Sequence, residues 1–353
     1  MVWIWVAACV LLAGVSAEAA DWVRPKNKTD RPVWGIRGHL HFSLWPTPVG
    51  GGGGTGGPRG LIQIGYPTLN GGRDPGLVNY IAVEPVTDRE PKGYSELEMS
   101  ELDHVPGKRF WVSRRSGAPR DPAKEWDSGT LTHPDPMYSE VEQLTVTLRM
   151  ERFANGAHPY LRVSLRSDRP DELELRTFAE DDSATMRECI LTATMGNFER
   201  LRLLYLKDEV VDCRKLFPGY EGTGFTGDGL FPLDRLARDS RGDVVVALET
   251  DESDPAASEP FPSSLSWRWR GPKLTQYWRK PEADVKRGLS FRVNARRVYW
   301  MSRQPLPGGL AYENAEFREP YRKGSRSVFG VTRLREEEVR RRVPGGAVDV
   351  IHG

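Results

Sequence analysis

The chain has 353 residues, with 50 Lys and Arg against 49 Asp and Glu and a formal net charge of +1. This balance provides no bulk electrostatic field, which argues against nucleic acid or an anionic membrane as the main partner. The length exceeds that of an average domain, although large β-sandwiches reach it as single units. The 27 prolines and 36 glycines interrupt the chain so often that few segments can form a helix of ordinary length.

Residues 1–19 have the features of an export signal. Residues 2–15 are almost wholly apolar, and Ala17-Glu18-Ala19 supplies the small-x-small pattern that signal peptidase accepts. The apolar run is shorter than the roughly 20 residues that span a bilayer. No Lys or Arg precedes it, so a buried N-terminal strand is the alternative, and lipidation at Cys9 is disfavoured because apolar residues continue beyond it. We expect a secreted or periplasmic protein whose mature chain has no transmembrane span.

Two cysteines, Cys189 and Cys213, remain after removal of the signal. An exported chain can join such a pair in one disulfide. Cys189 lies in an apolar, strand-like run, which suits a buried free thiol equally well. The sequence leaves both states open.

Strand-like segments follow one another along the chain. A glycine-rich stretch over residues 50–60 lacks the Gly-Lys-Ser/Thr of a phosphate loop and is expected to be a flexible connection. Apolar and polar residues alternate over 144–151 and again over 161–165, and an Asn155-Gly156 turn between them predicts a hairpin. Further strands are expected over residues 61–64, 78–83, 173–177, 244–248, 274–278, 289–293 and 328–331.

This succession predicts an all-β fold, a large antiparallel two-sheet sandwich with few short helices. A supersandwich of the kind seen in sugar mutarotases and a jelly roll both fit the pattern. Single helical turns are expected over 96–102 and 234–237, and no repeat of 20 to 50 residues supports a propeller or solenoid. We expect one domain over residues 20–335, followed by a tail or short helix over 336–353.

Histidines two residues apart form the first candidate site. If His39 and His41 lie on one strand, their side chains point to the same face and can share a metal. A third ligand would come from Glu84, His158 or Asp182. The favoured interpretation is a polar face or a single histidine that touches a sugar hydroxyl, so no metal is assigned and the cofactor stays unknown.

Acidic side chains form two further candidates. The loop over residues 93–101 carries carboxylates that suit Ca²⁺, but it lacks the spacing of a calcium loop, so a solvated turn is favoured. In the run over 179–183, strand alternation places Glu180 and Asp182 on one face, as a general acid and base would require. An ordinary acidic turn is the favoured alternative there.

The segment over residues 299–317 combines aromatic, amide, guanidinium and carboxylate groups around Gly308-Gly309. Sugars bind to this mixture, because rings stack on aromatic side chains while polar groups take the hydroxyls. The segment provides four candidate sugar contacts, namely Trp300, Arg303, Tyr312 and Asn314. Glu313 and Glu316 are its candidate acid or base residues. The alternative places Trp300 and Tyr312 in the core and Glu313 on the surface.

Aromatic and basic residues also alternate over 267–270 and 277–280, which adds Trp278 as a candidate sugar contact. The same alternation allows the tryptophans to lie in the core and the arginines outside. Four arginines would suit an acidic glycan if their side chains converge in the fold, namely Arg268, Arg270, Arg279 and Arg303.

Residues 79–85 and 299–317 resemble segments of exported β-sandwich proteins from bacteria that degrade polysaccharides. We therefore expect a protein that binds or modifies a polysaccharide or oligosaccharide, as a glycoside hydrolase or a polysaccharide lyase if it is an enzyme. A hydrolase would use Glu180 or Glu313 as acid, with Glu84 or Asp182 as its partner. A lyase would use His41 or Tyr312 as base and Arg303 to neutralise a uronate. The alternative is a non-catalytic sugar-binding or cell-envelope structural protein.

Overall fold

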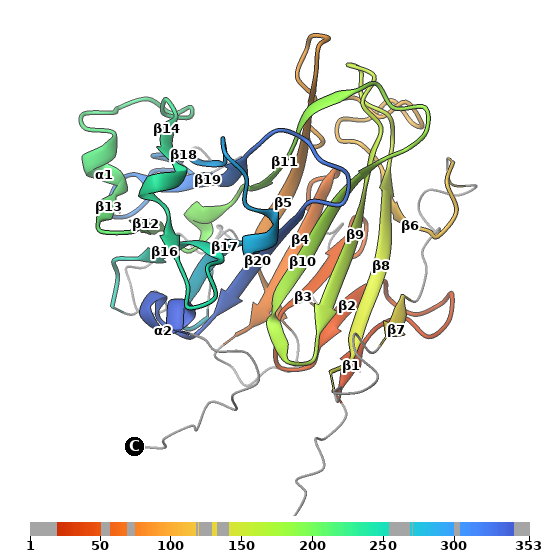
Figure 1. Cartoon of the computed structure of the whole chain (residues 1–353), viewed down its shortest axis with the longest axis horizontal. Helices are drawn as coiled ribbons and strands as arrows, with labels where there is room; N and C mark the ends of the chain where they lie inside the picture. The colour runs from red at the N-terminus through yellow and green to blue at the C-terminus, as the bar shows by residue number, and fades with distance from the viewer. Residues whose placement is uncertain are drawn as a thin grey trace, which may run out of the picture.

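Two large antiparallel sheets make up most of the protein (Figure 1). The computed structural model describes residues 20–50, 57–68, 75–117, 119, 129–132, 141–253, 269, 271–299 and 304–341. The signal-like residues 1–19 and most of the glycine-rich stretch lie outside these residues. The prediction of an all-β, two-sheet sandwich is confirmed.

The first sheet contains nine strands of the described part of the chain. In spatial order they are β1 (Trp22–Val23), β2 (Val33–Ile36), β3 (His41–Leu44), β4 (Leu61–Pro67), β5 (Pro75–Thr87), β11 (Met186–Ala193), β19 (Ala311–Arg318), β18 (Ser290–Arg296) and β14 (Gly229–Pro232).

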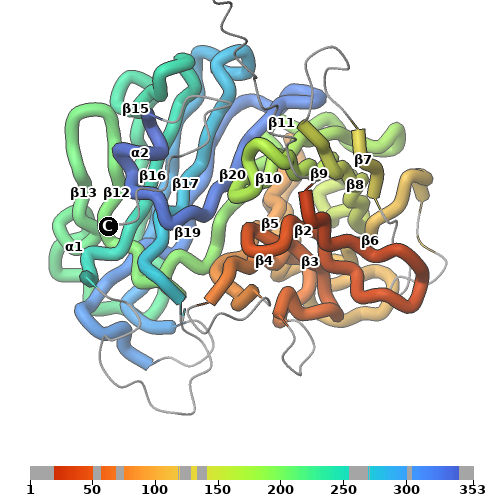
Figure 2. The backbone as a smooth tube through the Cα atoms, turned by 90° about the horizontal axis from the view of Figure 1, so that it is seen from below, coloured from red at the N-terminus to blue at the C-terminus, as the bar shows by residue number. Residues whose placement is uncertain are grey.

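The second sheet contains eleven described strands, nine of them in one path. The path runs through β13 (Val210–Asp212), β12 (Leu201–Tyr205), β16 (Val244–Thr250), β17 (Thr275–Lys280), β20 (Arg326–Thr332), β10 (Arg169–Ala179), β9 (Pro159–Arg166), β8 (Gln143–Met150) and β6 (Phe110–Val112). Strand β15 (Ala237–Arg238) pairs with β16, and β7 (Thr130–Thr132) pairs with β8. Figure 2 shows β12, β13 and β16 on the opposite side of the molecule from β6, β7 and β8.

Helices are few and short in the described chain. They are α1 (Cys213–Leu216), α2 (Glu336–Arg341) and the 3₁₀ turns η1 (Gly196–Phe198), η2 (Leu233–Arg235) and η3 (Glu282–Asp284). Turn η2 overlaps the helical turn expected over 234–237, and α2 falls within the expected C-terminal segment. Residues 96–102 form turns and no helix. No described helix is both long and apolar enough to cross a membrane.

The hairpin expected around Asn155-Gly156 forms as predicted. Strands β8 and β9 pair antiparallel, and β10 continues the meander. Gly156 adopts φ 83°, a left-handed conformation that a residue without Cβ reaches at low cost. The alternating leucines and valines of all three strands point inward and join the core between the sheets.

Polar groups of the two sheets also meet inside the sandwich. Asn79 of β5 donates a hydrogen bond to Gln276 of β17 at 2.6 Å, and Gln276 donates to Glu199 at 3.1 Å. The backbone amide of Leu274 also donates to Glu199, at 2.7 Å. Because buried polar groups lose water on folding, this fully bonded chain fixes how the two sheets align.

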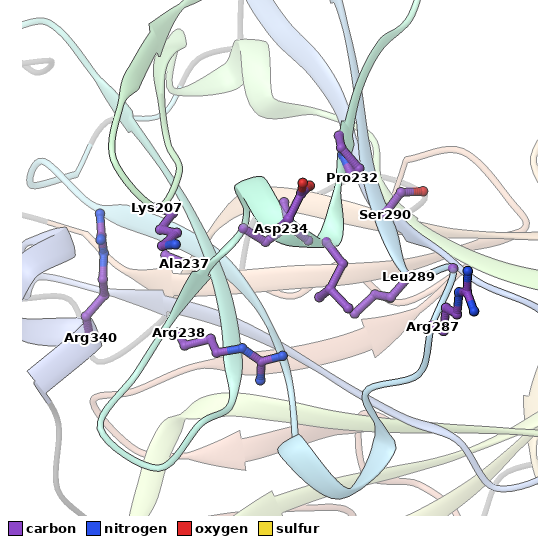
Figure 3. A pocket seen from close by; sticks show the side chains of 12 residues that line it. Lys207, Pro232, Asp234, Ala237, Arg238, Arg287, Leu289, Ser290 and Arg340 are labelled. Atoms are coloured by element: carbon purple, nitrogen blue, oxygen red, sulfur yellow. The ribbon is translucent and has the colours of Figure 1, made fainter.

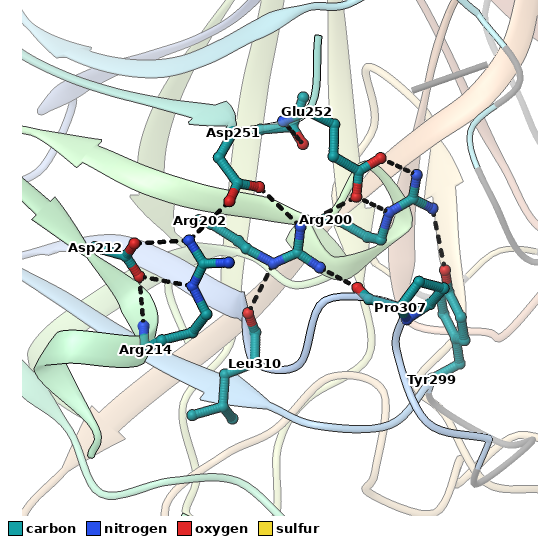
Figure 4. Close-up of polar contacts among 10 residues, drawn as sticks. Arg200, Arg202, Asp212, Arg214, Asp251, Glu252, Tyr299, Pro307 and Leu310 are labelled. Carbon is teal, nitrogen blue, oxygen red and sulfur yellow. Dashed lines mark hydrogen bonds and ion pairs between the residues drawn. The ribbon is translucent and has the colours of Figure 1, made fainter. Parts of the chain in front are cut away.

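A buried arginine joins β12 to the loop that leads into β19 (Figure 4). The guanidinium of Arg202 donates to the carbonyl of Leu310 at 3.1 Å and to that of Pro307. It also pairs with Asp251 at 2.8 Å and with Glu252 at 3.0 Å. Arg202 therefore holds the entry to β19, the strand on which several candidate residues lie.

Candidate functional site

Four adjacent strands of the first sheet carry polar side chains on the face turned away from the core. Val83, Leu191 and Phe317 point inward, so their chain neighbours point outward. In the order β5, β11, β19 and β18, the outward residues are Glu84, Thr192, Glu316 and Arg292. We call this surface the outer face of the first sheet.

A single hydroxyl group connects two carboxylates on this face. Thr192 Oγ1 lies 3.1 Å from Glu84 Oε1 and 2.5 Å from Glu316 Oε2. Arg292 Nε lies 2.6 Å from Glu316 Oε1, and the Arg292 guanidinium reaches to 3.8 Å from Glu84 Oε2. The side chain of Glu316 is fully buried, whereas Glu84 keeps a small exposed fraction of 6%.

The loop after β5 adds a third carboxylate. The Ser95 amide donates to the Val83 carbonyl at 3.1 Å, and Ser95 Oγ accepts from the Val83 amide at 2.9 Å. This pairing continues the sheet beyond the start of β4 and places the half-buried Tyr94 and Glu96 near Glu84. We call Glu84, Glu96 and Glu316 the carboxylate cluster.

The cluster favours bound protons. Burial and the neighbouring carboxylates of Glu316 and Glu96 raise the pKa of Glu84 to about 8. Burial also raises the pKa of Glu96 and of Glu316, although the Arg292 guanidinium opposes the change at Glu316. Burial and the charge of Glu84 raise the pKa of Tyr94, which keeps its phenol protonated. At neutral pH the cluster therefore holds a proton on Glu84.

A cleft of about 680 Å³ lies on the side of β18 and β19, and it meets the cluster through two arginines. Arg292 and Arg318 line it, and both lie within 4 Å of Glu316. Four further charged side chains line the same cleft, namely Arg187, Glu188, Asp228 and Glu319. We call it the arginine cleft.

Glu313, the predicted acid, is buried on β19 beyond Glu316. Arg296 provides a counter-charge, with its guanidinium 4.0 Å from the carboxylate. Glu313 Oε2 has no hydrogen-bond partner in the described part of the chain, and the same is true of Asn314 Oδ1. Burial raises the pKa of Glu313 to about 8. The interpretation of Glu313 as a surface residue is therefore wrong, because the residue is only 2% exposed.

The other two predicted catalytic residues lie elsewhere. His41 is buried on β3, which β4, β5 and β11 separate from β19. At about 4.8 Å per strand this distance is about 19 Å. Glu180 follows β10 of the second sheet and forms an ion pair with Arg149. The structure does not bring His41, Glu180 and Glu313 together.

The histidine pair is also separated by local structure. Strand β3 begins at His41, whereas His39 lies in the preceding turn, where Gly38 adopts φ 82°. His39 Nδ1 lies 2.9 Å from Asp171 Oδ1 on the second sheet. The expectation of one shared strand face is therefore wrong, and no group of three or more metal-ligating side chains occurs within the described residues.

Two predicted sugar contacts lie in the core. Trp278 is 1% exposed, and its indole N–H donates to the Ala315 carbonyl at 2.8 Å. Tyr312 is also 1% exposed, and its hydroxyl donates to the Val211 carbonyl at 3.0 Å. Neither ring leaves surface for a ligand, because both are packed in the core between the sheets. The hydrogen bond of Trp278 joins β17 to β19, and that of Tyr312 joins β19 to β13.

The remaining predictions concern arginines, Trp300 and the cysteines. Trp300, Arg303, Arg268 and Arg270 lie outside the described residues. Arg279 is buried on β17 and pairs with Asp239 and Glu172, each at 2.9 Å. Cys189 and Cys213 are both free thiols.

The sequence suggested Glu84 as a metal ligand or catalytic partner and Glu316 as a possible acid or base, but it did not indicate that the two lie together. Each is a carboxylate next to apolar residues in a strand, in Ala82-Val83-Glu84 and in Ala315-Glu316-Phe317. Such a residue sits opposite the core, and it remains buried only if other groups cover it. The sequence therefore contained a local signal for each carboxylate. It contained no signal that β5 and β19 would both lie next to β11.

Searches for this chain among protein-family models, curated proteins and solved structures found no match.

Proposed function

We propose that the protein is an exported, carbohydrate-active enzyme that hydrolyses a glycosidic bond by general acid catalysis at Glu84. One observation carries the proposal, namely the carboxyl of Glu84 with a pKa raised to about 8, 3.8 Å from the Arg292 guanidinium that lines the arginine cleft. Glycoside hydrolysis needs a carboxylic acid that remains protonated near neutral pH and a second carboxylate near it.

The cluster supplies distinct roles for its members. Glu84 donates the proton to the leaving oxygen, because it carries the proton and keeps exposed surface. Glu96 is the second carboxylate, because it is half-buried and can face a substrate, whereas Glu316 is fully buried. Glu316 is a positioning residue that raises the pKa of Glu84 by its charge.

The lining of the arginine cleft supports a sugar as substrate. Guanidinium and carboxylate groups form paired hydrogen bonds with neighbouring hydroxyls, and the cleft carries both kinds of group. A lyase mechanism receives less support, because Tyr94 has a raised pKa and is a poor base at neutral pH.

The test measures new reducing ends from neutral and acidic polysaccharides. Glu84→Gln is expected to lower the rate about 10²- to 10⁴-fold, the usual contribution of a general acid. Glu209→Gln, an exposed carboxylate paired with Arg235, is the matched control and should leave the rate unchanged. The wild-type rate should fall as the pH rises through about 8, because the acid then loses its proton. Sugar binding without any product would support a non-catalytic binding protein instead.

A further inference from the structure

A second and larger cavity, of about 840 Å³, lies between β14, β15, the start of β18 and α2 (Figure 3). Its lining includes four cationic side chains and one carboxylate, namely Lys207, Arg238, Arg287, Arg340 and Asp234. We call this cavity the basic pocket. Figure 3 shows Lys207 and Arg340 on one side of it and Arg287 on the other.

The charges of the basic pocket are only partly balanced. Arg340 pairs with Glu336 of α2, and Arg238 donates to the Gly242 carbonyl at 2.5 Å. The side chains of Lys207 and Arg287 have no ion pair or hydrogen bond with any residue that the structure describes. The pocket therefore has an excess of positive charge in a protein whose overall charge is nearly zero.

Apolar side chains form the rest of the pocket. Leu233, Leu236 and Leu289 line it between the charged groups. A volume of this size holds a ligand larger than an inorganic anion. Positive groups around an apolar floor suit a ring with one face of C–H groups and an anionic substituent.

The basic pocket adjoins the arginine cleft. Gly288 and Ser290 line both cavities. Ser290 and Arg292 are alternate residues of β18, so their side chains share one face about 7 Å apart. A ligand that occupies the basic pocket can thus extend past Ser290 to Arg292 and the carboxylate cluster.

We propose that the basic pocket binds a carboxylate or sulfate group of an acidic glycan whose chain continues through the arginine cleft to Glu84. The identity of the ligand as a glycan rests on the proposed function. The shared chemistry is a saccharide with an anionic substituent, as a uronate or as a sulfate ester.

The experiment compares binding of polygalacturonate, dextran sulfate and neutral dextran to the full chain by isothermal titration calorimetry. The test variant is Arg238→Ala/Arg287→Ala, which removes two cations from the pocket. The control is Lys26→Ala/Lys286→Ala, which removes the same charge from exposed positions outside both cavities. Catalysis is measured separately with Glu84→Gln, which should still bind.

The test variant is expected to bind its anionic ligand about tenfold more weakly, while the control binds as wild type. A loss with polygalacturonate alone identifies a uronate, and a loss with dextran sulfate alone identifies a sulfate ester. Equal loss in the control, or no binding of either anionic polymer by wild type, would overturn the inference. Binding without product formation would refute the hydrolase proposal and leave the pocket standing. Cleavage of neutral dextran that does not depend on Arg238 and Arg287 would support the hydrolase proposal and refute the inference about the basic pocket.

Discussion

Glu84 and Glu316 lie on strands β5 and β19, which are not neighbours, yet both hydrogen bond to the hydroxyl of Thr192 on the strand between them. A single hydroxyl has one proton, so it can donate to only one of the two at a time. The second carboxyl is accommodated at low cost if it carries its own proton. This arrangement fits the raised pKa of Glu84.

Thr192→Val tests the hydroxyl that the two carboxyls share. The substitution keeps the shape but leaves buried oxygens without a donor, so the free energy of unfolding should fall by about 1–3 kcal/mol. The bond from Thr192 lowers the pKa of Glu84, so its loss should move the alkaline limb of activity upward. Urea denaturation and a pH–rate profile measure the two effects. Thr192→Ser restores the hydroxyl, and a defect of equal size in that variant would contradict the explanation.

Stability should depend on pH through three buried carboxyls, Glu84, Glu199 and Glu313, each with a pKa raised to about 8. Between about pH 4.5 and 8 the folded state holds protons that the unfolded state has lost, so stability falls as the pH rises through this window. The stability that these carboxyls contribute is fully present below their pKa in the unfolded chain. Thermal unfolding followed from pH 4.5 to 9 would show the decline.

Glu313→Gln should flatten this pH dependence. Glutamine matches the protonated carboxyl in shape and carries no charge, so the variant should equal wild type near pH 5. At pH 8.5 it should be more stable by at least about 1 kcal/mol, the value of one pKa unit. Glu209→Gln at an exposed position provides the comparison. A parallel shift of the Glu313 variant at every pH would show that packing, and not charge, causes the effect.

Arg292→Ala removes the cation closest to Glu316. A buried carboxylate that loses its partner typically costs about 3–5 kcal/mol, and we expect a loss of that size at pH 8. At pH 5 the loss should be smaller, because Glu316 can then take up a proton. Arg187→Ala is the control, since Arg187 and its partner Asp88 are 70% exposed and should contribute less than about 1 kcal/mol.

Arg202→Lys tests the anchor of the loop before β19. Lysine keeps the charge but cannot reach both carbonyls and both carboxylates that the guanidinium contacts. Stability should fall by about 2–3 kcal/mol in urea denaturation. Arg235→Lys at an exposed ion pair should change it little. If Arg202→Lys equals wild type, the network of Figure 4 does not hold the loop.

The two thiols should be unreactive in the folded protein. Burial raises the pKa of Cys189 to about 12 and raises that of Cys213 further. Thiolate is the reactive form, so a disulfide reagent should titrate two more thiols after unfolding than before. An equal count in both states would contradict the arrangement of a half-buried Cys189 and a buried Cys213, both unpaired.

The sequence by itself determined the local elements of this protein. Alternation over residues 144–151 and 161–165, with Asn155-Gly156 between them, was enough to predict the β8–β9 hairpin, because pairing and turn are close in the chain. The all-β class followed in the same way. These features depend on side-chain period and turn chemistry, which a short window contains.

Only the tertiary structure decided which strands became neighbours. Residues 84, 192, 292 and 316 are distant in the chain and meet because β5, β11, β19 and β18 lie side by side in one sheet. That order follows from the burial of one face of each strand against the second sheet, and no local pattern records it. The same burial places Trp278 and Tyr312 in the core. The carboxylates on the opposite face of the first sheet form the candidate site.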